Sequence, residues 1–232
     1  MHADRHTSRW VYTMFWTLTG YSKLCNFMSM MIGKIYNIDR KFKMYFYIIW
    51  NRIKFKLKGV QFGCNLKVYA KMYLSHSPNS IIKIGKKFIF TSGDCYNPLC
   101  RNIRGCIIAN PNASIIIGDN VGMSSPCIWA HSLITIGNNV NIGGDCILMD
   151  SDAHSLNYLE RRNPKLDLAN TNDSPIIIED DVLIGARCII LKGVTIGART
   201  VIGSGSVVTK SIPADCIAAG NPCKVIRYIN RI

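Results

Sequence analysis

One histidine of this chain lies where it could do acid–base chemistry. His154 sits in a polar stretch, residues 149–177, that separates two regions rich in branched aliphatic residues. An imidazole can accept a proton near neutral pH, and a group that holds its second ring nitrogen fixes the tautomer and the orientation of the ring. Asp152 is the candidate for that orienting role, with Asp150 as the alternative. The stretch therefore predicts a general base.

The residues after this stretch follow a six-residue period. Between residues 178 and 212 a branched aliphatic residue recurs at every sixth position: Ile178, Ile184, Ile190, Ile196, Ile202 and Val208. Four places after each of them comes a second, mostly smaller residue: Val182, Cys188, Val194, Thr200, Ser206 and Ile212. A period of six fits neither a helix nor a hairpin strand. It predicts an all-β repeat protein, a parallel β-helix in which three hexapeptides form one triangular coil.

The same phase extends upstream, so we expect the β-helix to occupy residues 59–229. Ile136, Ile142 and Leu148 continue it, and Ile128 and Ile134 fit if one turn is shifted. From residue 59 to residue 104 the repeat is irregular, with these candidate interior residues: Val60, Val68, Ile81, Ile82 and Ile84. The polar stretch 149–177 interrupts the rhythm, which indicates a loop extruded from one corner of the prism. Long ordered loops in such folds are usually functional.

Four sequence blocks carry a resemblance to a known family. They are Ile178-Glu-Asp-Asp-Val-Leu-Ile-Gly, Ile189-Ile-Leu-Lys-Gly-Val-Thr-Ile-Gly, Val201-Ile-Gly-Ser-Gly-Ser-Val-Val-Thr-Lys and Ile217-Ala-Ala-Gly-Asn-Pro-Cys-Lys-Val-Ile. Residues 81–229 resemble the left-handed β-helix acyltransferases of the hexapeptide family, in particular the galactoside and maltose O-acetyltransferases. The resemblance implies left-handed winding, acetyl-CoA as cosubstrate, a sugar hydroxyl as acceptor, and a homotrimer with sites between subunits. It also implies that His154 is the catalytic base.

The resemblance further implies roles for particular residues. Backbone groups at the turns of Gly185-Ala186 and of Ser204 would line the pantetheine slot. Basic and polar positions would bind the far end of coenzyme A: Thr209, Lys210, Lys224 and Arg227. Lys224 replaces an arginine of the family and loses its bidentate geometry. Ser125 and His131 would contact the acceptor, although the family has Asn and Asp there, and Arg161 and Arg162 would contact the acceptor or a neighbouring subunit.

Other functions remain alternatives. A xenobiotic or other small-molecule acetyltransferase would use the same histidine, and a non-catalytic scaffold would keep only the prism. A γ-class carbonic anhydrase needs three histidine ligands on neighbouring coils, yet only His131 and His154 lie in the regular repeats. Cys95, Cys100 and Cys106 lack a histidine at zinc-ligand spacing, so we expect no metal. We prefer an O-acetyltransferase of surface polysaccharide or glycolipid synthesis, with a polysaccharide precursor as its acceptor.

The basic character of the chain is concentrated before the repeats. Residues 1–71 contribute a net +11 of the total +14. Apolar residues at helical spacing in residues 10–36, and aromatics among Lys and Arg in residues 40–58, predict an amphipathic helical segment over residues 1–58. It would cap the open end of the β-helix, contact an anionic membrane surface, or do both.

Several classes and compartments are disfavoured by the same sequence. The longest uncharged run in the N-terminal segment has thirteen residues, which is too short to span a bilayer. No nucleic-acid recognition motif accompanies the charge. With ten cysteines but no signal peptide, we expect reduced thiols in a cytoplasmic protein, either free in the cytoplasm or peripheral to the inner membrane face.

Overall fold

A computed structural model describes the backbone of residues 6–93 and 96–229 and the side chains of these ranges except those of residues 6–25 and 36. Cys95 therefore lies outside the described residues. Two compact units are present, Met1–Tyr45 and Phe46–Ile232. The second unit holds the β-helix and the last turns of the N-terminal helix.

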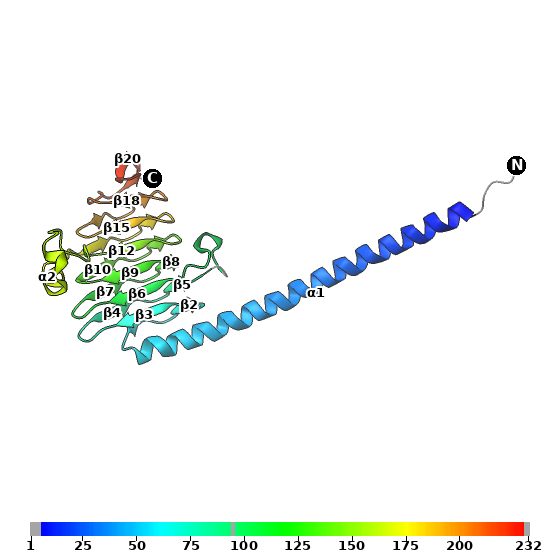
Figure 1. Cartoon of the computed structure of the whole chain (residues 1–232), viewed down its shortest axis with the longest axis horizontal. Coiled ribbons are helices and arrows are strands. Elements are labelled where there is room, and N and C mark those ends of the chain that lie inside the picture. Colours follow the sequence, from blue (N-terminus) through cyan, green and yellow to red (C-terminus); the bar gives the residue numbers. More distant parts are fainter. Residues whose placement is uncertain (1–5, 94–95, 230–232) are drawn as a thin grey trace. The chain divides into compact units, whose positions relative to one another are not determined.

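The N-terminal segment, predicted to be helical over residues 1–58, is one continuous helix, α1 (His6–Leu57) (Figure 1). No proline occurs within these 52 residues, and neither Gly20 nor Gly33 breaks the helix. The helix ends at Leu57, two residues before Gly59, whose φ of +76° suits glycine, and the Val60 amide donates to the Phe55 carbonyl at 3.0 Å. Within the part of the chain that the structure describes, no helix is both long and apolar enough to cross a membrane.

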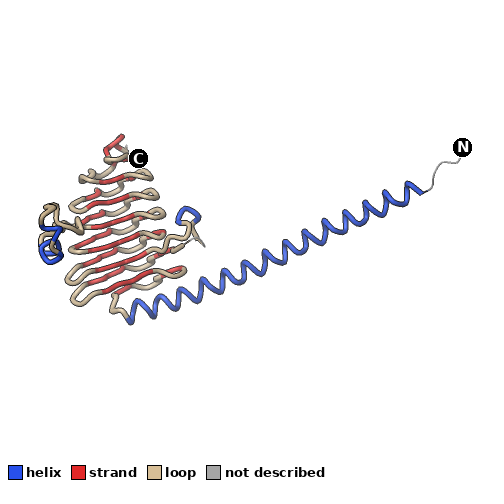
Figure 2. The backbone as a smooth tube through the Cα atoms, viewed as in Figure 1, coloured by secondary structure: helices blue, strands red, loops and turns tan. Residues whose placement is uncertain are grey.

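The strands of the second unit stack into three sheets, as Figure 2 shows. Sheet A contains β1 (Gln61–Phe62), β4 (Ile81–Ile84), β7 (Ser114–Ile117), β10 (Leu133–Ile136), β13 (Ile176–Ile178) and β16 (Thr195–Ile196). Sheet B contains β2 (Lys67–Tyr69), β5 (Ile89–Thr91), β8 (Gly122–Ser124), β11 (Asn141–Ile142), β14 (Leu183–Ile184), β17 (Val201–Ile202), β19 (Cys216–Ala219) and β20 (Lys224–Tyr228). Sheet C contains β3 (Tyr73–His76), β6 (Cys106–Ala109), β9 (Cys127–Ala130), β12 (Ile147–Met149), β15 (Ile189–Leu191) and β18 (Val207–Val208). The pairing is parallel except for β20, which runs antiparallel to β19.

The interior confirms the six-residue pattern. All the aliphatic and small positions predicted between residues 178 and 212 are buried. Ile128 and Ile134 are also buried, and they align with Leu148 and Ile115 in neighbouring coils. In the irregular first coils, Ile81 is wrong as an interior residue, because it is 43% exposed while Ile82 points inward.

The last turns of α1 cap the first coil. Phe55 is fully buried, and Asn51 donates from Nδ2 to the carbonyls of Val68 and Ala70, both at 3.0 Å. Arg52 donates to the Leu66 carbonyl at 2.9 Å. These contacts cover apolar side chains and backbone acceptors that the first coil would otherwise expose, which is the role that a terminal repeat needs filled.

Two long segments leave the prism at different corners (Figure 1). Residues 92–93 and 96–105 leave between sheets B and C, and the second of these ranges contains η1 (Pro98–Cys100). This excursion was not predicted from the sequence. Residues 150–175 leave between sheets C and A and contain η2 (Glu160–Arg162) and α2 (Pro164–Ala169). This second segment is the predicted extruded loop, here called the C–A loop.

Candidate active site

The C–A loop is ordered at its base by its own pairing. Ser151 and Asp173 form an antiparallel bridge, and the Ser174 amide donates to the Asp150 carbonyl at 2.8 Å. Asp152 forms an ion pair with Lys192 of the next coil, with 3.1 Å between Oδ2 and Nζ. The loop is therefore fixed to the prism, and its tip can hold a defined side-chain geometry.

His154 is paired with a carboxylate from the far side of the same loop. Its Nδ1 lies 2.7 Å from Oδ2 of Asp167, and Oδ1 of Asp167 accepts the Ser155 amide at 2.7 Å. The hydrogen bond from His154, and then that from the Ser155 amide, hold the pKa of Asp167 below its usual value. An ionised carboxylate can only accept, so Nδ1 carries the proton and Nε2 of a neutral ring is free to accept one.

Local structure places Asp167 opposite the imidazole. Asn163 caps α2 by accepting the amide of Lys165 at 3.0 Å, and Pro164 occupies the first helical position. The short helix presents Asp167 in its first turn. Ser155, beside the histidine, is buried and donates to Glu160, while Arg161 donates to the Ser155 carbonyl at 2.6 Å.

The predicted orienting residues have other partners. Asp150 is fully buried and its carboxylate accepts the amides of His131 and Ser132 at 2.6 and 2.8 Å, so it fixes the turn of the coil below. Asp152 pairs with Lys192. The prediction of Asp152 as orienter is therefore wrong for this structure, where Asp167 occupies that position.

The two acceptor candidates differ in accessibility. Ser125 is buried, and its hydroxyl accepts the Gly93 amide at 2.9 Å, so in this structure it fixes a corner rather than presenting a free hydroxyl to an acceptor. His131 is partly exposed. Its ring lies 5.0 Å from that of Trp129, centroid to centroid, and 3.2 Å separates its Nδ1 from Nδ2 of Asn110.

Arg161 and Arg162 were predicted to contact the acceptor or a neighbouring subunit. In the single chain, both contact residues of their own loop. Arg161 holds the Ser155 carbonyl, as described above, and the guanidinium of Arg162 lies over the ring of Tyr158 at 5.4 Å. Both arginines are exposed.

The coenzyme A candidates fall into three groups. Gly185, Ala186 and Ser204 stack at the corner between sheets B and C, where a Cβ on Gly185 would lie 2.5 Å from the Ser204 nitrogen. Thr209 and Lys210 lie at the corner between sheets C and A, two coils beyond the C–A loop.

Lys224 and Arg227 form the third group and are exposed on β20.

Sheet C separates the stacked turns of Gly185, Ala186 and Ser204 from His154. Each strand of sheet C starts near the corner between sheets B and C and ends near the corner between sheets C and A. A strand of three or four residues spans roughly 10–13 Å. One chain therefore does not bring these two groups together.

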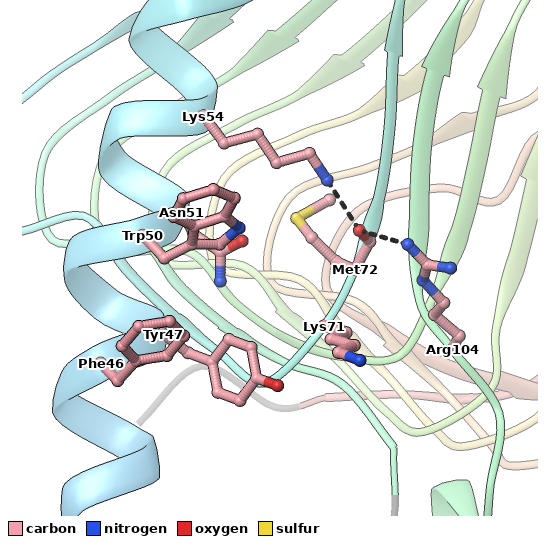
Figure 3. Close-up of a pocket in the computed structure, with 8 residues that line it drawn as sticks. All are labelled: Phe46, Tyr47, Trp50, Asn51, Lys54, Lys71, Met72 and Arg104. Carbon is pink, nitrogen blue, oxygen red and sulfur yellow. Dashed lines mark hydrogen bonds between the residues drawn. The ribbon is translucent and has the colours of Figure 1, made fainter.

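A pocket of about 320 Å³ lies at the base of α1 (Figure 3). Phe46, Tyr47 and Trp50 line one side. Lys54 and Arg104 converge on the carbonyl of Met72, at 2.9 and 3.1 Å. Burial, and then the charges of Arg104 and Lys58, lower the pKa of Lys54. This basic, aromatic pocket is distinct from the C–A loop and was not predicted.

Among the residues described, no cluster of three or more His, Cys, Asp or Glu side chains could hold a metal ion. The site is instead a histidine–carboxylate pair on an ordered loop of a hexapeptide β-helix. A histidine–carboxylate pair on an ordered loop of a parallel β-helix is an arrangement suited to general acid–base chemistry.

Comparisons with known proteins show what the repeat region is similar to. Residues 175–210 match the family model described as the hexapeptide repeat of succinyl-transferase. Galactoside O-acetyltransferase of Escherichia coli (strain K12) is 42% identical over 97 residues, which are 42% of this chain and 45% of that protein. A 2,3,4,5-tetrahydropyridine-2,6-dicarboxylate N-acetyltransferase of Staphylococcus aureus (strain Newman) is 49% identical over 59 residues, 25% of each chain. The matches thus span less than half the length of these two relatives.

A solved structure shows the same fold. The N-acyltransferase AntD of Bacillus cereus, in complex with dTDP and coenzyme A, has a TM-score of 0.55 at 19% identity, covering 77% of this chain and 89% of that one. The fold is a left-handed parallel β-helix. The comparisons therefore relate residues 175–210 to the hexapeptide-repeat family model, and the fold of the chain to that of an N-acyltransferase.

Proposed function

We propose that the protein is an acetyl-CoA-dependent O-acetyltransferase that acts on a sugar hydroxyl. The observation that carries the proposal is the 2.7 Å contact between Nδ1 of His154 and Asp167, which leaves Nε2 as a proton acceptor on an accessible loop. Similarity to a galactoside O-acetyltransferase supports the acceptor class, and two relatives named as acetyltransferases support the acyl group.

The reaction needs only groups that this arrangement offers. Nε2 of His154 takes the proton of the acceptor hydroxyl while that oxygen attacks the thioester carbonyl. The tetrahedral intermediate then collapses, the C–S bond breaks, and the imidazolium returns the proton to the departing thiolate of coenzyme A. Asp167 keeps the ring oriented and stabilises the imidazolium by its charge. A thioester is already activated, so no covalent enzyme intermediate is required.

The donor would bind along the prism and meet the histidine of a neighbouring chain. Gly185, Ala186 and Ser204 would line the pantetheine slot, while Thr209 and Lys210 would lie near the far end of the cofactor. Lys224 and Arg227 would face its phosphates. Because the slot and His154 lie at opposite edges of sheet C, a homotrimer would complete each site with residues of two chains.

The proposal also includes where in the cell the enzyme would act. An acceptor that is a surface polysaccharide precursor or a glycolipid would place the enzyme on the cytoplasmic side of the inner membrane. The net +11 of residues 1–71 supports peripheral attraction to anionic lipid. Such attraction should weaken in 1 M salt, where the Debye length is about 3 Å. Co-sedimentation with anionic and neutral liposomes tests this point, and equal binding to both lipids would contradict it.

The experiment that tests the function is acetyl transfer from acetyl-CoA to a panel of saccharides, followed by mass spectrometry of the products. His154→Ala should lower kcat by roughly 10²–10⁴-fold with little loss of coenzyme A affinity. Undiminished turnover in that variant would exclude His154 as the base. If transfer occurred only to small non-sugar hydroxyls, a xenobiotic acetyltransferase would be favoured, and failure to bind coenzyme A would favour a scaffold.

A further inference from the structure

The exposed side of α1 carries a regular apolar stripe. Between residues 28 and 49 its members are spaced alternately three and four positions apart: Met28, Met31, Ile35, Ile38, Phe42, Tyr45 and Ile49. All seven are between 42% and 72% exposed. A mean spacing of 3.5 residues is that of the seam between helices in a coiled coil, where the first and fourth positions of each heptad are apolar.

The spacing itself distinguishes between two kinds of partner. On a straight helix a 3.5-residue stripe drifts by about 20° per heptad, so over three heptads it slants by roughly 60°. A helix that supercoils around α1 follows this slant. A flat bilayer surface does not, because it requires a stripe parallel to the helix axis. The seam therefore fits another helix better than it fits a membrane.

The charges beside the seam match a parallel partner of identical sequence. In a parallel coiled coil, the last residue of one heptad (position g) faces a residue of the next heptad (position e) on the neighbouring helix, which is numbered five higher. By this rule Lys34 faces Asp39, and Phe27 faces Ile32. Asp39 is the only acidic residue in the 52 residues of α1. It also pairs with Lys43 of its own helix at 2.6 Å, where both side chains remain about half exposed or more.

The residue types in the seam indicate how many helices meet. Ile35 and Ile38 occupy the first and fourth positions of one heptad, a combination that favours three or more strands over two. Apolar residues beside the seam, such as Ile32 and Phe46, widen it further. We propose that residues 28–49 of α1 form a parallel three-stranded coiled coil with two further copies of this chain.

Capping of the β-helix and the coiled coil use different sides of the helix. Asn51 and Phe55 are buried against the first coil, whereas Ile49 and Ile53 remain 59% and 48% exposed. The seam is therefore free where α1 contacts the prism. This proposal has the same three-fold symmetry as the proposed trimeric enzyme, but it does not depend on catalysis.

Cysteine cross-linking of the full chain tests the seam directly. Ile38→Cys places a thiol at the fourth heptad position, so mild oxidation should link two chains of each trimer. Asn37→Cys is the matched control, because position 37 points away from the axis. The unsubstituted chain sets the background, since Cys64 is exposed. Equal cross-linking at positions 37 and 38, or none above background, would overturn the proposal.

Charge reversal distinguishes a partner helix from a membrane. Lys34→Glu and Asp39→Lys should each slow cross-linking through Ile38→Cys by about two- to five-fold, and the double reversal should restore it. Residues five apart on one helix do not face each other, so such restoration requires contact between chains. The proposal would be contradicted if the effects of the two reversals on cross-linking were additive. It would also be contradicted if cross-linking appeared only with vesicles containing phosphatidylglycerol. Neither result bears on acetyl transfer, so failure here is separable from failure of the proposed function.

Discussion

At the scale of single residues, the proton of Nδ1 in His154 depends on Asp167. Asp167→Asn keeps the shape of the side chain but removes its charge, and its amide can donate to Nδ1 and favour the tautomer with the proton on Nε2. We expect kcat to fall by roughly 10²–10⁴-fold with KM for acetyl-CoA changed little. Steady-state kinetics at saturating acceptor provide the measurement.

Asp152→Asn is the matched control for this variant. It removes a carboxylate of the same loop that contacts Lys192 and not the imidazole. Its kcat should stay within about ten-fold of the parent enzyme. Equal losses in the two variants would show that general order of the loop, rather than contact with the imidazole, limits catalysis.

The carboxylate of Asp167 should also make the stability of the protein depend on pH. Hydrogen bonds from His154 and the Ser155 amide lower the pKa of Asp167 in the native protein. In the unfolded chain, an Asp has a pKa of about 3.9, so the unfolded chain binds this proton more tightly. The stabilisation is therefore fully present above the unfolded pKa and is lost as pH falls through the lower native value. Melting temperatures measured from about pH 6 to pH 2 should decline more steeply for the parent protein than for Asp167→Asn. Parallel curves would contradict this linkage.

Sequence reasoning selected His154 but not its carboxylate partner, for a physical reason. His154 stands out because a polar stretch interrupts an apolar period. Asp167 is thirteen residues away, and only the fold of the C–A loop brings it back. The Asn163-Pro164 pair was the available signal, because it starts a short helix that carries Asp167 in its first turn. Nearness in sequence instead favoured Asp152.

At the scale of elements, the end of α1 should stabilise the first coil. Phe55 is fully buried, and Phe→Ala changes at such sites cost about 3–5 kcal/mol. Because each coil contacts only its neighbours, the loss should first appear as fraying of β1–β5. Hydrogen exchange of these strands and urea unfolding measure it in Phe55→Ala. Trp50→Ala is the control, because Trp50 is 53% exposed, and it should lower the free energy of unfolding by about 1 kcal/mol or less. Equal losses in the two variants would show that the end of α1 does not cap the first coil.

Elements with a strict period were predictable, and those without one were not. The coils from residue 105 onward repeat an interior pattern that allows one arrangement. The excursion of residues 92–105 was missed because it lies in the irregular first coils, where no surrounding rhythm marks an interruption. The sequence predicted a helical segment before the coils, and α1 is continuous because nothing between its two compositionally different stretches breaks a helix.

At the scale of the whole molecule, the positions of the two halves of the site predict complementation between defective chains. His154 lies at one edge of sheet C, and the Gly185, Ala186 and Ser204 turns lie at the other, so a site shared by two chains takes one half from each. His154→Ala removes the base, and Ala186→Phe fills the slot. Each variant alone should be inactive, while its fold, judged by circular dichroism, should persist.

Co-expressed in equal amounts, the two variants should recover about a quarter of the parent activity. Each site then has one chance in two of receiving an intact base from one chain, and one chance in two of receiving an intact slot from its neighbour. Variants purified separately and mixed without exchange of subunits serve as the control and should remain inactive. If co-expressed chains were also inactive, both halves of the site would have to come from one chain, and the shared site of the proposed trimer would be wrong.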